Sequence, residues 1–468
     1  CRILEMLAQL SNGQQILAVT FTNKAAQEMR ARLAPQVGDV DKKFFIGTFH
    51  QFCLSMLRDR LGREVEVASP EKSLEMAQVL WPGLLKQEYK RRLERMSWWK
   101  AVAFELAKPV EVSKYIEAMR ARDLYDFDDL LLETVRCLEQ DGGLRHSLQQ
   151  TYAHLFVDEY QDINPIQHRL LTLLTGKQNT LTAIGDPNQA IYGFRGSDVR
   201  FFHSFGHDFP GAEILSLQEN FRSAPNLVSA SGQMIRPDAS PDVPSQVARI
   251  YAQGQLTVHA APTDKAEAEY VVHTIEQLVG GTSMFSQDSG RVESHQQGQL
   301  SFGDIAVLYR LKSQAHQLEK AFARSGMPYH VVGKSVNDQD LDDDLFAQRQ
   351  ADEDVVAEKV LLMSLHASKG LEFPCVFVCG CEDGLVPLNL FELASDLAEE
   401  RRLLYVGMTR AKERLYLTHA RKRMLYGKHL SLEPSRFLQD IEESLKQHSR
   451  SEFKKKRPEP DDGQMTLF

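Results

Sequence analysis

Short apolar runs alternate with helix-like segments from the start of the chain. Residues 16–22 (ILAVTFT) and 44–48 (FFIGT) are rich in β-branched and aromatic residues, which predicts buried strands. The first run is followed by NKAAQEMRARL, whose apolar positions recur with helical spacing. Strands that alternate with helices predict an α/β fold with parallel sheets.

The pattern becomes helical through residues 61–124, which predicts a helical insertion in the first α/β block. Strand-like runs then resume with HLFVDE, LTAIGD and AEILSL. A second α/β block follows, with the predicted strands QLTVHA, DIAVLYR, KVLLMSL, CVFVCG and RLYLTHA. We therefore expect two sheet-based domains, with a small helical insertion in the first.

Three polar segments interrupt this pattern. Residues 281–300 are rich in Gly, Ser and Gln, which predicts a surface loop. Residues 335–357 hold eight acids against one arginine, which is typical of a solvated linker. From residue 446 the chain is polar and carries a basic run, so we predict a disordered tail over 446–468.

Composition narrows the classes of protein that the chain can represent. With 43% hydrophobic residues among 468, the chain can bury large cores. No apolar run reaches the length of about 18 residues that a membrane span needs, and no secretory signal is visible, so we expect a cytoplasmic protein without membrane contact. The net charge of -9 means that any nucleic-acid binding must come from local basic patches.

The run HLFVDEYQD ends a predicted strand with Asp158, Glu159 and Asp162. Carboxyl ends of parallel strands form the crevice in which open sheets bind ligands. There, one acid could hold magnesium and a second could orient and deprotonate a water that attacks a γ-phosphate. Taken alone, the same residues also fit a solvated acidic loop.

A second strand end adds chemistry. In AIGDPNQAIYGFRGSD, Gln189 follows the strand, and Tyr192, Phe194 and Arg195 lie in a loop bounded by glycines. Aromatic rings beside an arginine can stack bases, at about 1 to 3 kcal/mol per base. Further along, Arg222 and Arg410 stand in ENFRS and YVGMTRAK. An isolated arginine is usually only a surface charge, so the case for a functional role depends on the order and spacing of the motifs that contain these arginines.

Seven blocks stand in one order along the chain: VTFTNKAAQEMRARL, IGTFHQF, VDEYQD, GDPNQAIYGFRGS, ENFRS, LHASKGLEF and YVGMTRAK. In this order they resemble the motifs of the UvrD/Rep/PcrA family of superfamily 1 DNA helicases. The resemblance implies two RecA-like parallel-sheet lobes of the P-loop NTPase type. The implied parts are a first lobe at 1–60 and 125–225, a helical insertion at 61–124, a second lobe at 226–334 and 358–445, an acidic linker at 335–357 where the family inserts a large subdomain, and the tail at 446–468.

The resemblance also implies how ATP and Mg²⁺ are used. Asp158 would coordinate magnesium, Glu159 would activate water and Gln189 would sense the γ-phosphate. Arg222 and Arg410, contributed by the two lobes, would act as arginine fingers. The remaining implied nucleotide-binding residues are Phe221, in place of the usual tyrosine on the adenine, Glu372 near the ribose, and Lys369 and Gly370 in the same motif.

For DNA, the resemblance implies 3′-to-5′ movement along a single strand, with single-stranded DNA or single-strand/duplex junctions as partners. His366 would couple the strand to the ATP site. Phe21 and Phe49 could instead be core residues. The implied DNA-binding residues are Thr20, Phe21, Thr22, Asn23, Thr48, Phe49, His50, Tyr192, Phe194, Arg195 and His366.

The sequence departs from the family in having no G-x-x-x-x-G-K-[ST] loop, which would cradle the β-phosphate. Since the chain starts at Cys1 inside a helix-like run, we expect a sequence cut just after that loop, and poor ATP hydrolysis by the chain as printed. The main hypothesis is a helicase of bacterial DNA repair or replication restart. The alternative is a catalytically silent DNA-binding or clamp-recruited scaffold, and a helicase subunit of a recombination nuclease is disfavoured.

The last five residues, QMTLF, resemble the peptide that binds the bacterial sliding clamp. Gln464, Leu467 and Phe468 would be its anchors in a small apolar pocket. Five residues are a short signal, and a tail that ends in apolar residues by chance remains the alternative.

Overall fold

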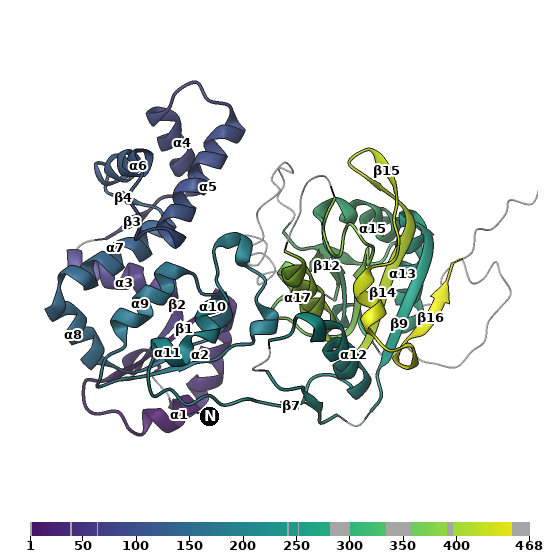
Figure 1. The fold of residues 1–468 in the computed structure, drawn as a ribbon, viewed down its shortest axis with the longest axis horizontal. Coiled ribbons are helices and arrows are strands. Elements are labelled where there is room, and N and C mark those ends of the chain that lie inside the picture. The colour runs from purple at the N-terminus through teal and green to yellow at the C-terminus, as the bar shows by residue number, and fades with distance from the viewer. Residues whose placement is uncertain are drawn as a thin grey trace, which may run out of the picture. The chain divides into compact units, whose positions relative to one another are not determined.

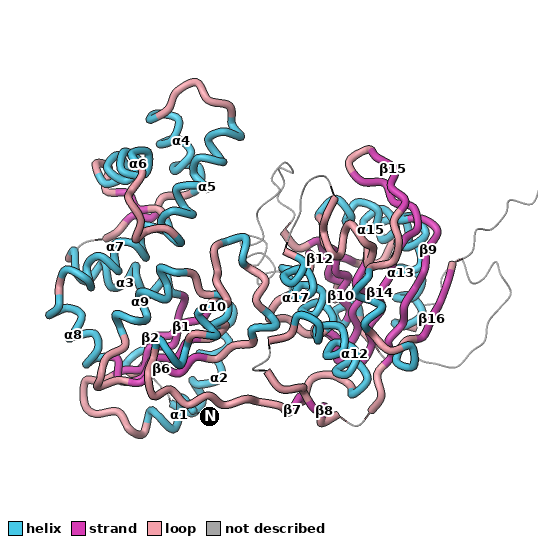
Figure 2. The backbone as a smooth tube through the Cα atoms, viewed as in Figure 1, coloured by secondary structure: helices cyan, strands magenta, loops and turns pink. Residues whose placement is uncertain are grey.

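Two parallel sheets, one in each of two units, form the framework of the chain in the computed structural model (Figure 1, Figure 2). Unit 1 comprises Cys1–Ser216 and Ser240–Pro244, and unit 2 comprises Leu217–Ala239 and Ser245–Phe468. The structure describes residues 2–37, 40–62, 64–240, 243–250, 252–280, 300–333, 358–390 and 396–451. Most of the predicted loop at 281–300, the acidic segment 335–357 and the anchors Gln464, Leu467 and Phe468 lie outside these residues.

The described strands of the unit 1 sheet run in the order β2-β1-β5-β6, and all pairs are parallel. Each strand coincides with a predicted apolar run, so the α/β prediction is confirmed here. The strands are β1 (Gln15–Thr20), β2 (Phe44–Thr48), β5 (Tyr152–Val157) and β6 (Thr180–Ala183).

Helices pack on both faces of this sheet. Ile16 and Ala18 of β1 share one apolar cluster with α1 and α2. Leu17 and Val19 share the opposite cluster with α3, α7 and α9. Because both faces are covered, a ligand can reach the sheet mainly at its strand ends. The helices are α1 (Arg2–Leu7), α2 (Asn23–Val37), α3 (Phe49–Leu61), α7 (Phe127–Gln140), α8 (Gly142–Thr151), α9 (Pro165–Leu174), α10 (Arg200–His203) and α11 (Phe205–Asp208).

Three helices occupy the stretch where the sequence predicts an insertion, and Figure 1 shows them lying together. Lys100 is fully buried there, with Nζ 2.7 Å from Asp129 Oδ1 and 2.5 Å from Asp126 Oδ2. Because Asp126 caps α7 and Asp129 lies in its first turn, this buried cation ties the insertion to the rest of unit 1. The elements are β3 (Glu66–Val67), α4 (Pro70–Leu80), α5 (Lys86–Val102), α6 (Val110–Arg120) and β4 (Leu124–Tyr125).

The sheet of unit 2, over its described strands, runs β11-β12-β10-β13-β14-β9-β16 with parallel pairs, and β15 forms a hairpin on β14. Five of these strands match the predicted runs. The strands are β9 (Gln255–Thr263), β10 (Ile305–Tyr309), β11 (Tyr329–Val331), β12 (Val360–Ser364), β13 (Phe373–Cys379), β14 (Ala411–Leu425), β15 (Lys428–Ser431) and β16 (Gln447–Arg450). The longer helices are α12 (Pro225–Ile235), α13 (Asp264–Val279), α15 (Lys312–Ser325) and α17 (Leu397–Met408).

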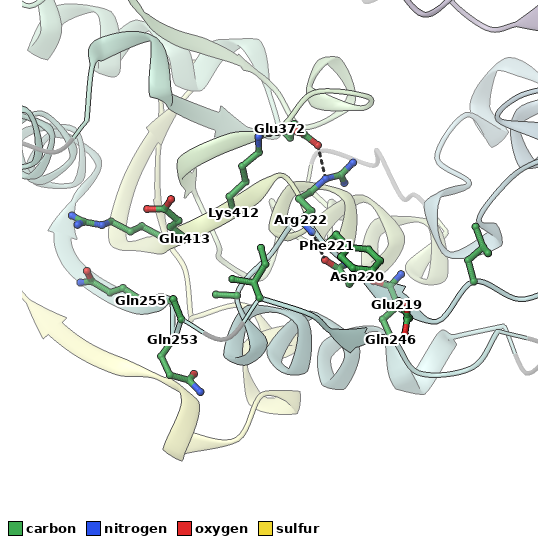
Figure 3. A pocket seen from close by; sticks show the side chains of 16 residues that line it. Glu219, Asn220, Phe221, Arg222, Gln246, Gln253, Gln255, Glu372, Lys412 and Glu413 are labelled. Atoms are coloured by element: carbon green, nitrogen blue, oxygen red, sulfur yellow. Dashed lines mark hydrogen bonds and ion pairs between the residues drawn. The ribbon is translucent and has the colours of Figure 1, made fainter. Parts of the chain in front are cut away.

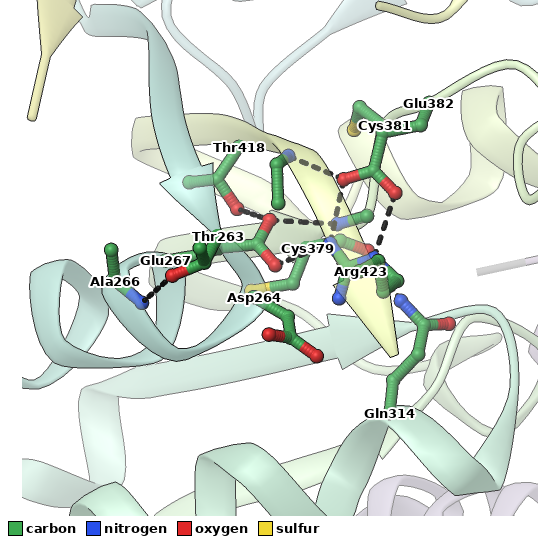
Figure 4. A network of polar contacts seen from close by, with 12 residues as sticks. Thr263, Asp264, Ala266, Glu267, Gln314, Cys379, Cys381, Glu382, Thr418 and Arg423 are labelled. Carbon is green, nitrogen blue, oxygen red and sulfur yellow. Dashed lines mark hydrogen bonds and ion pairs between the residues drawn. The ribbon is translucent and has the colours of Figure 1, made fainter. Parts of the chain in front are cut away.

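A buried ion network fixes the middle of this sheet (Figure 4). Arg423 Nη2 lies 2.5 Å from Glu267 Oε2 and 2.6 Å from Glu382 Oε1. Burial opposes ionisation of Glu267, but Arg423 holds the pKa of this carboxyl below its ordinary value. The Thr418 hydroxyl and the Gly380 amide also donate to Glu267, so the buried charges are satisfied.

The predicted strand AEILSL is absent from the structure. Ile214 and Leu215 lie in irregular, exposed chain, and β7 (Glu219–Asn220), which pairs with β8 (Val247–Ala248), begins only afterwards. The division between the two units falls inside this run, after Ser216. The alternation of apolar and polar residues was therefore not enough to make this run a strand of either sheet.

The prediction of a disordered tail from residue 446 is wrong for its first residues. β16 pairs in parallel with β9, which is otherwise the margin of the sheet. The side chain of His259 in β9 holds β16 in place: Nδ1 lies 2.7 Å from Ser449 Oγ, and Nε2 lies 3.0 Å from Oγ of Ser451, the residue directly after β16. The imidazole also stacks on Tyr270, with ring centroids 3.4 Å apart.

We predict that mild acid weakens unit 2 through His259. Burial lowers the pKa of His259 from 6.5 to about 4, so between these values the unfolded chain binds more protons than the folded one. Lowering the pH from about 7.5 to about 5 should therefore reduce the free energy of unfolding, by about 1 to 2 kcal/mol from this group. Urea titrations at both values would measure this change.

The variant His259→Asn should lose part of that pH dependence. His273→Asn, at an exposed histidine on the neighbouring helix α13, is the matched control and should keep it. An identical pH dependence in the parent and in His259→Asn would contradict the assignment.

Candidate functional site

The acidic segment after β5 is held across three strand ends of unit 1. The Asp158 amide donates to the Val19 carbonyl at 3.0 Å, and the Tyr160 amide donates to the Ile184 carbonyl at 2.9 Å. The loops after β5 and β6 are therefore fixed side by side, as parallel pairing requires. This brings Asp158 and Glu159 to the same edge as Gln189.

A chain of hydrogen bonds links Glu159 to Gln189. The Gln161 side-chain amide donates to Glu159 Oε2, while its Oε1 accepts from the Asp186 amide at 3.0 Å. Asp186 Oδ2 in turn accepts from Gln189 Nε2 at 2.9 Å. We call these four residues the relay. Gln161 is buried, so the relay has a fixed centre with Glu159 and Gln189 at its ends.

Glu159 has a backbone conformation that is uncommon for its residue type. Its φ is 53° and its ψ is 42°, in the left-handed region that favours glycine. A residue held there costs on the order of 1 kcal/mol or more and persists where the surroundings impose it. The turn that follows (Tyr160–Asp162) is buried and supplies this constraint.

The acids at this edge suit magnesium in the way that nucleotide sites use it. Over the described residues, the structure contains no group of three His, Cys, Asp or Glu side chains placed to form a complete metal cage. Mg²⁺ commonly takes one or two carboxylates and completes its shell with water and phosphate oxygens. Asp158 fits that kind of site.

Aromatic rings gather beside the same edge. Phe21 and Tyr192 stack with centroids 5.6 Å apart and an interplanar angle of 9°, and Tyr192 lies 6.2 Å from Phe194. The Arg195 guanidinium is 5.4 Å from the Phe194 ring. Tyr192 is only 3% exposed whereas Phe194 is 56% exposed, so the face available to a base belongs to Phe194.

The other predicted DNA-binding residues of unit 1 lie at strand ends, at helix starts or in the core. Thr20 ends β1 and is buried, and Thr22 Oγ1 accepts from the Ala25 amide at the start of α2, which begins at Asn23. Thr48 and Gln51 form a reciprocal cap on α3. Phe49 lies in the core, which was the alternative for this residue, and His50 meets Phe127 edge to face at 5.6 Å.

In unit 2, Arg222 and Lys412 both reach Glu372 (Figure 3). Arg222 Nε lies 2.7 Å from Glu372 Oε2, and Lys412 Nζ lies 2.8 Å from Glu372 Oε1. All three line a pocket of about 950 Å³ whose described lining belongs to unit 2, and Phe221 stands in its wall, 71% exposed. The structure thus brings together three of the predicted nucleotide residues, and Lys412 joins them.

Arg410, a predicted arginine finger, is buried within unit 2. It is 2% exposed, and its guanidinium donates to the carbonyl oxygens of Val406 at 3.0 Å and Leu371 at 3.1 Å. Arg222 and Arg410 both lie in unit 2, so the expectation that they come from different lobes is wrong.

The loop that carries Arg222 belongs to unit 2 because contacts with backbone carbonyls hold it to β14. Ser223 Oγ donates to the Ala411 carbonyl at 2.7 Å, and the Ala224 amide donates to the Lys412 carbonyl at 2.9 Å. These bonds place Leu217–Ala239 with unit 2, earlier than the predicted boundary at 225.

The motif with His366 forms a tight turn ahead of β13. His366 is buried in a short 3₁₀ turn (His366–Ser368), and the Lys369 amide donates to the His366 carbonyl at 3.3 Å. Gly370 follows with φ 82°, a conformation that an L side chain rarely adopts. The turn therefore positions Glu372 at the pocket.

Sequence reasoning missed two residues of these sites. Gln161 stands inside VDEYQD, and a glutamine two positions after Glu159 and directly before Asp162 was the available signal. Lys412 closes YVGMTRAK, but nothing in the sequence links it to Glu372, 40 positions earlier.

We predict that Gly185→Ala breaks the relay. A Cβ at this position would lie 2.3 Å from Gln161 Oε1 and 3.2 Å from the Tyr160 amide nitrogen, so the buried Gln161 side chain must move. Hydrogen exchange of the Asp186 amide should accelerate, and unfolding should require about 1 to 3 kcal/mol less. Gly206→Ala, with nothing within 4 Å, is the control. Unchanged exchange at Asp186 would show that Gln161 does not hold the relay together.

Comparison with known proteins places the chain in a family. The ATP-dependent DNA helicase PcrA of Staphylococcus aureus is 26% identical over 612 residues, which cover 93% of this chain and 81% of the relative. PcrA of Staphylococcus epidermidis is 26% identical over 605 residues, which cover 92% and 80%. The crystal structure of the C-terminal domain of a possible DNA helicase from Lactobacillus plantarum is 18% identical, with a TM-score of 0.30, and the match covers 49% of this chain and 98% of that one.

Two family models cover most of both units. The UvrD/Rep helicase N-terminal domain matches residues 1–210. The UvrD-like helicase C-terminal domain matches residues 215–336 and 342–422. The chain therefore belongs to the UvrD/Rep helicase family.

Proposed function

We propose that this protein is an ATP-dependent DNA helicase or translocase that moves 3′ to 5′ along single-stranded DNA, in the bacterial cytoplasm, during DNA repair or replication restart. Membership of the helicase family supports the activity, as do relatives that are named ATP-dependent DNA helicases. The 3′-to-5′ direction of movement and the role in DNA repair or replication restart are inferred from the resemblance of the motifs.

The relay from Glu159 to Gln189 is the observation that carries this proposal. Hydrolysis requires that the water-activating carboxylate be coupled to the presence of a γ-phosphate. A hydrogen-bonded path of two side chains and one backbone amide connects Glu159 to Gln189 and can provide this coupling. We assign Glu159 as the general base and Gln189 as the phosphate sensor. Asp158 would hold Mg²⁺, which, when bound, neutralises charge on the phosphates.

Unit 2 would contribute the groups that recognise the nucleotide. Phe221 presents an exposed ring suited to stacking on adenine, and Glu372 beside it suits a ribose hydroxyl. Arg222 would neutralise phosphate charge. Arg410 would do the same from a guanidinium that the Val406 and Leu371 carbonyls hold in place.

DNA contact would centre on the aromatic cluster of unit 1. Phe194 offers the exposed ring, Tyr192 lies against it and stacks on Phe21, and Arg195 adds a positive charge. Stacking tolerates every base, which suits a protein that moves along DNA of any sequence.

We predict that Glu159→Gln, in the full-length gene product, lowers kcat for DNA-stimulated ATP hydrolysis by about 10²- to 10⁴-fold, because the amide cannot accept the proton of the attacking water. DNA affinity should stay at the parent level. Glu105→Gln, at an exposed acid of the insertion, is the control. Turnover near the parent rate in Glu159→Gln would remove the assigned base, whereas a folded parent without any turnover would favour the catalytically silent DNA-binding scaffold.

We predict that Phe194→Ala weakens binding of a fluorescent oligothymidylate about tenfold, in line with about 1 to 3 kcal/mol for one stacked base. Trp98→Ala is the matched control, because Trp98 is 54% exposed on α5 and lies outside the cluster. Fluorescence anisotropy at fixed salt measures both. Equal affinities of the two variants would place the DNA elsewhere.

A further inference from the structure

Two cations share one carboxylate at the pocket of unit 2. Arg222 binds Glu372 Oε2 through Nε, and Lys412 binds Glu372 Oε1 through Nζ. The three side chains are partly exposed, at 38%, 43% and 35% for Arg222, Glu372 and Lys412, so a ligand in the pocket can reach them. The hydrogen bond from Lys412 and the charge of Arg222 lower the pKa of Glu372, which keeps it ionised.

A β-bulge brings Lys412 to this position. Phe373 of β13 pairs with Ala411 of β14, but Cys375 pairs with Arg414, so β14 carries one extra residue between these pairs. Pro374 stands opposite, and proline has no amide to complete the ladder. A bulge of this kind redirects side chains, and it occurs here beside the pocket.

The same bulge holds the loop that carries Arg222. The carbonyl oxygens of Ala411 and Lys412 accept from Ser223 and Ala224, which are buried. Arg222 and Lys412 thus extend from one rigid backbone junction. The backbone segments that carry the two side chains are therefore fixed relative to each other, and both side chains end at Glu372.

The geometry leaves part of Arg222 uncommitted to Glu372. A guanidinium has five N–H donors, and the bond to Glu372 uses Nε, so the two terminal nitrogens are not bonded to this carboxylate. A carboxylate prefers a two-bond fork with arginine, which would draw in one of those nitrogens. Lys412 holds the second oxygen of Glu372 and so opposes that fork.

We propose that Lys412 is a positioning residue: by occupying Glu372 Oε1 it keeps Arg222 singly bonded, so that the arginine tip stays available to the phosphate chain of a nucleotide. This inference rests on the proposed function, because it gives Lys412 a task in the same nucleotide site. An ordinary surface ion pair would contribute little and would leave catalysis unchanged when removed.

The test compares DNA-stimulated ATP hydrolysis in the full-length gene product and its variants. Lys412→Met keeps an unbranched side chain of nearly the same length and removes the charge. We expect kcat to fall about tenfold while KM for ATP changes by less than about threefold. Lys412→Arg should restore most of the loss. Lys422→Met removes an exposed lysine from the same strand and should match the parent.

A second background separates positioning from direct contact. In Glu372→Gln the carboxylate no longer competes for Arg222, so adding Lys412→Met should have almost no further effect on kcat. Thermal unfolding of each variant should stay close to that of its background, since Lys412 is partly exposed.

Three outcomes overturn the inference. A parent-like kcat in Lys412→Met removes the role, and an equal loss in both backgrounds shows that Lys412 acts directly on the nucleotide. A folded parent that hydrolyses no ATP removes the proposed function together with this inference. That last case is separate, because it is seen in the parent before any variant is compared.

Discussion

The parallel register between β5 and β6 is the constraint on which the first unit depends. Val157 pairs with Ala183, so the residues after each strand leave the sheet at the same edge and at the same height. The backbone bond from Tyr160 to Ile184 then locks the two loops together, and Gln161 can reach both Glu159 and Asp186. A shift of one residue in this pairing would separate the acid from the glutamine without altering either side chain.

The second unit uses charge in two different ways. Arg423 is buried between Glu267 and Glu382, where its loss would strand two carboxylates in an apolar core. The cluster around Glu372 is partly exposed and rests on backbone bonds that do not involve its charges. The sheet is thus stabilised by buried charged side chains with fixed partners. The charged side chains of the pocket are partly exposed, so a ligand can replace one of their partners at small energetic cost.

The strands that could be predicted are those buried on both faces, because parallel strands read as short apolar runs. β16 could not be predicted, since its sequence QHSR has no apolar alternation and its place depends on the open margin of β9 and on His259. The resemblance of the motifs singled out Glu159, Gln189, Arg222 and Glu372, and the structure links the first two through the relay and the last two through an ion pair. The environments of Arg410 and Lys412 depend on contacts with Leu371 and Glu372, which are distant in sequence and invisible to local patterns.

β16 also has a consequence for the solubility of the protein. An uncovered β9 would present a row of backbone donors and acceptors along nine residues, a template onto which a strand from another molecule could add. The polar strand at Gln447–Arg450 covers the middle of this row, opposite 257–260, from within the same chain, and its His and Arg side chains disfavour the addition of another strand. A version of this protein without Gln447–Arg450 would therefore expose the backbone edge of β9 to strands of other molecules.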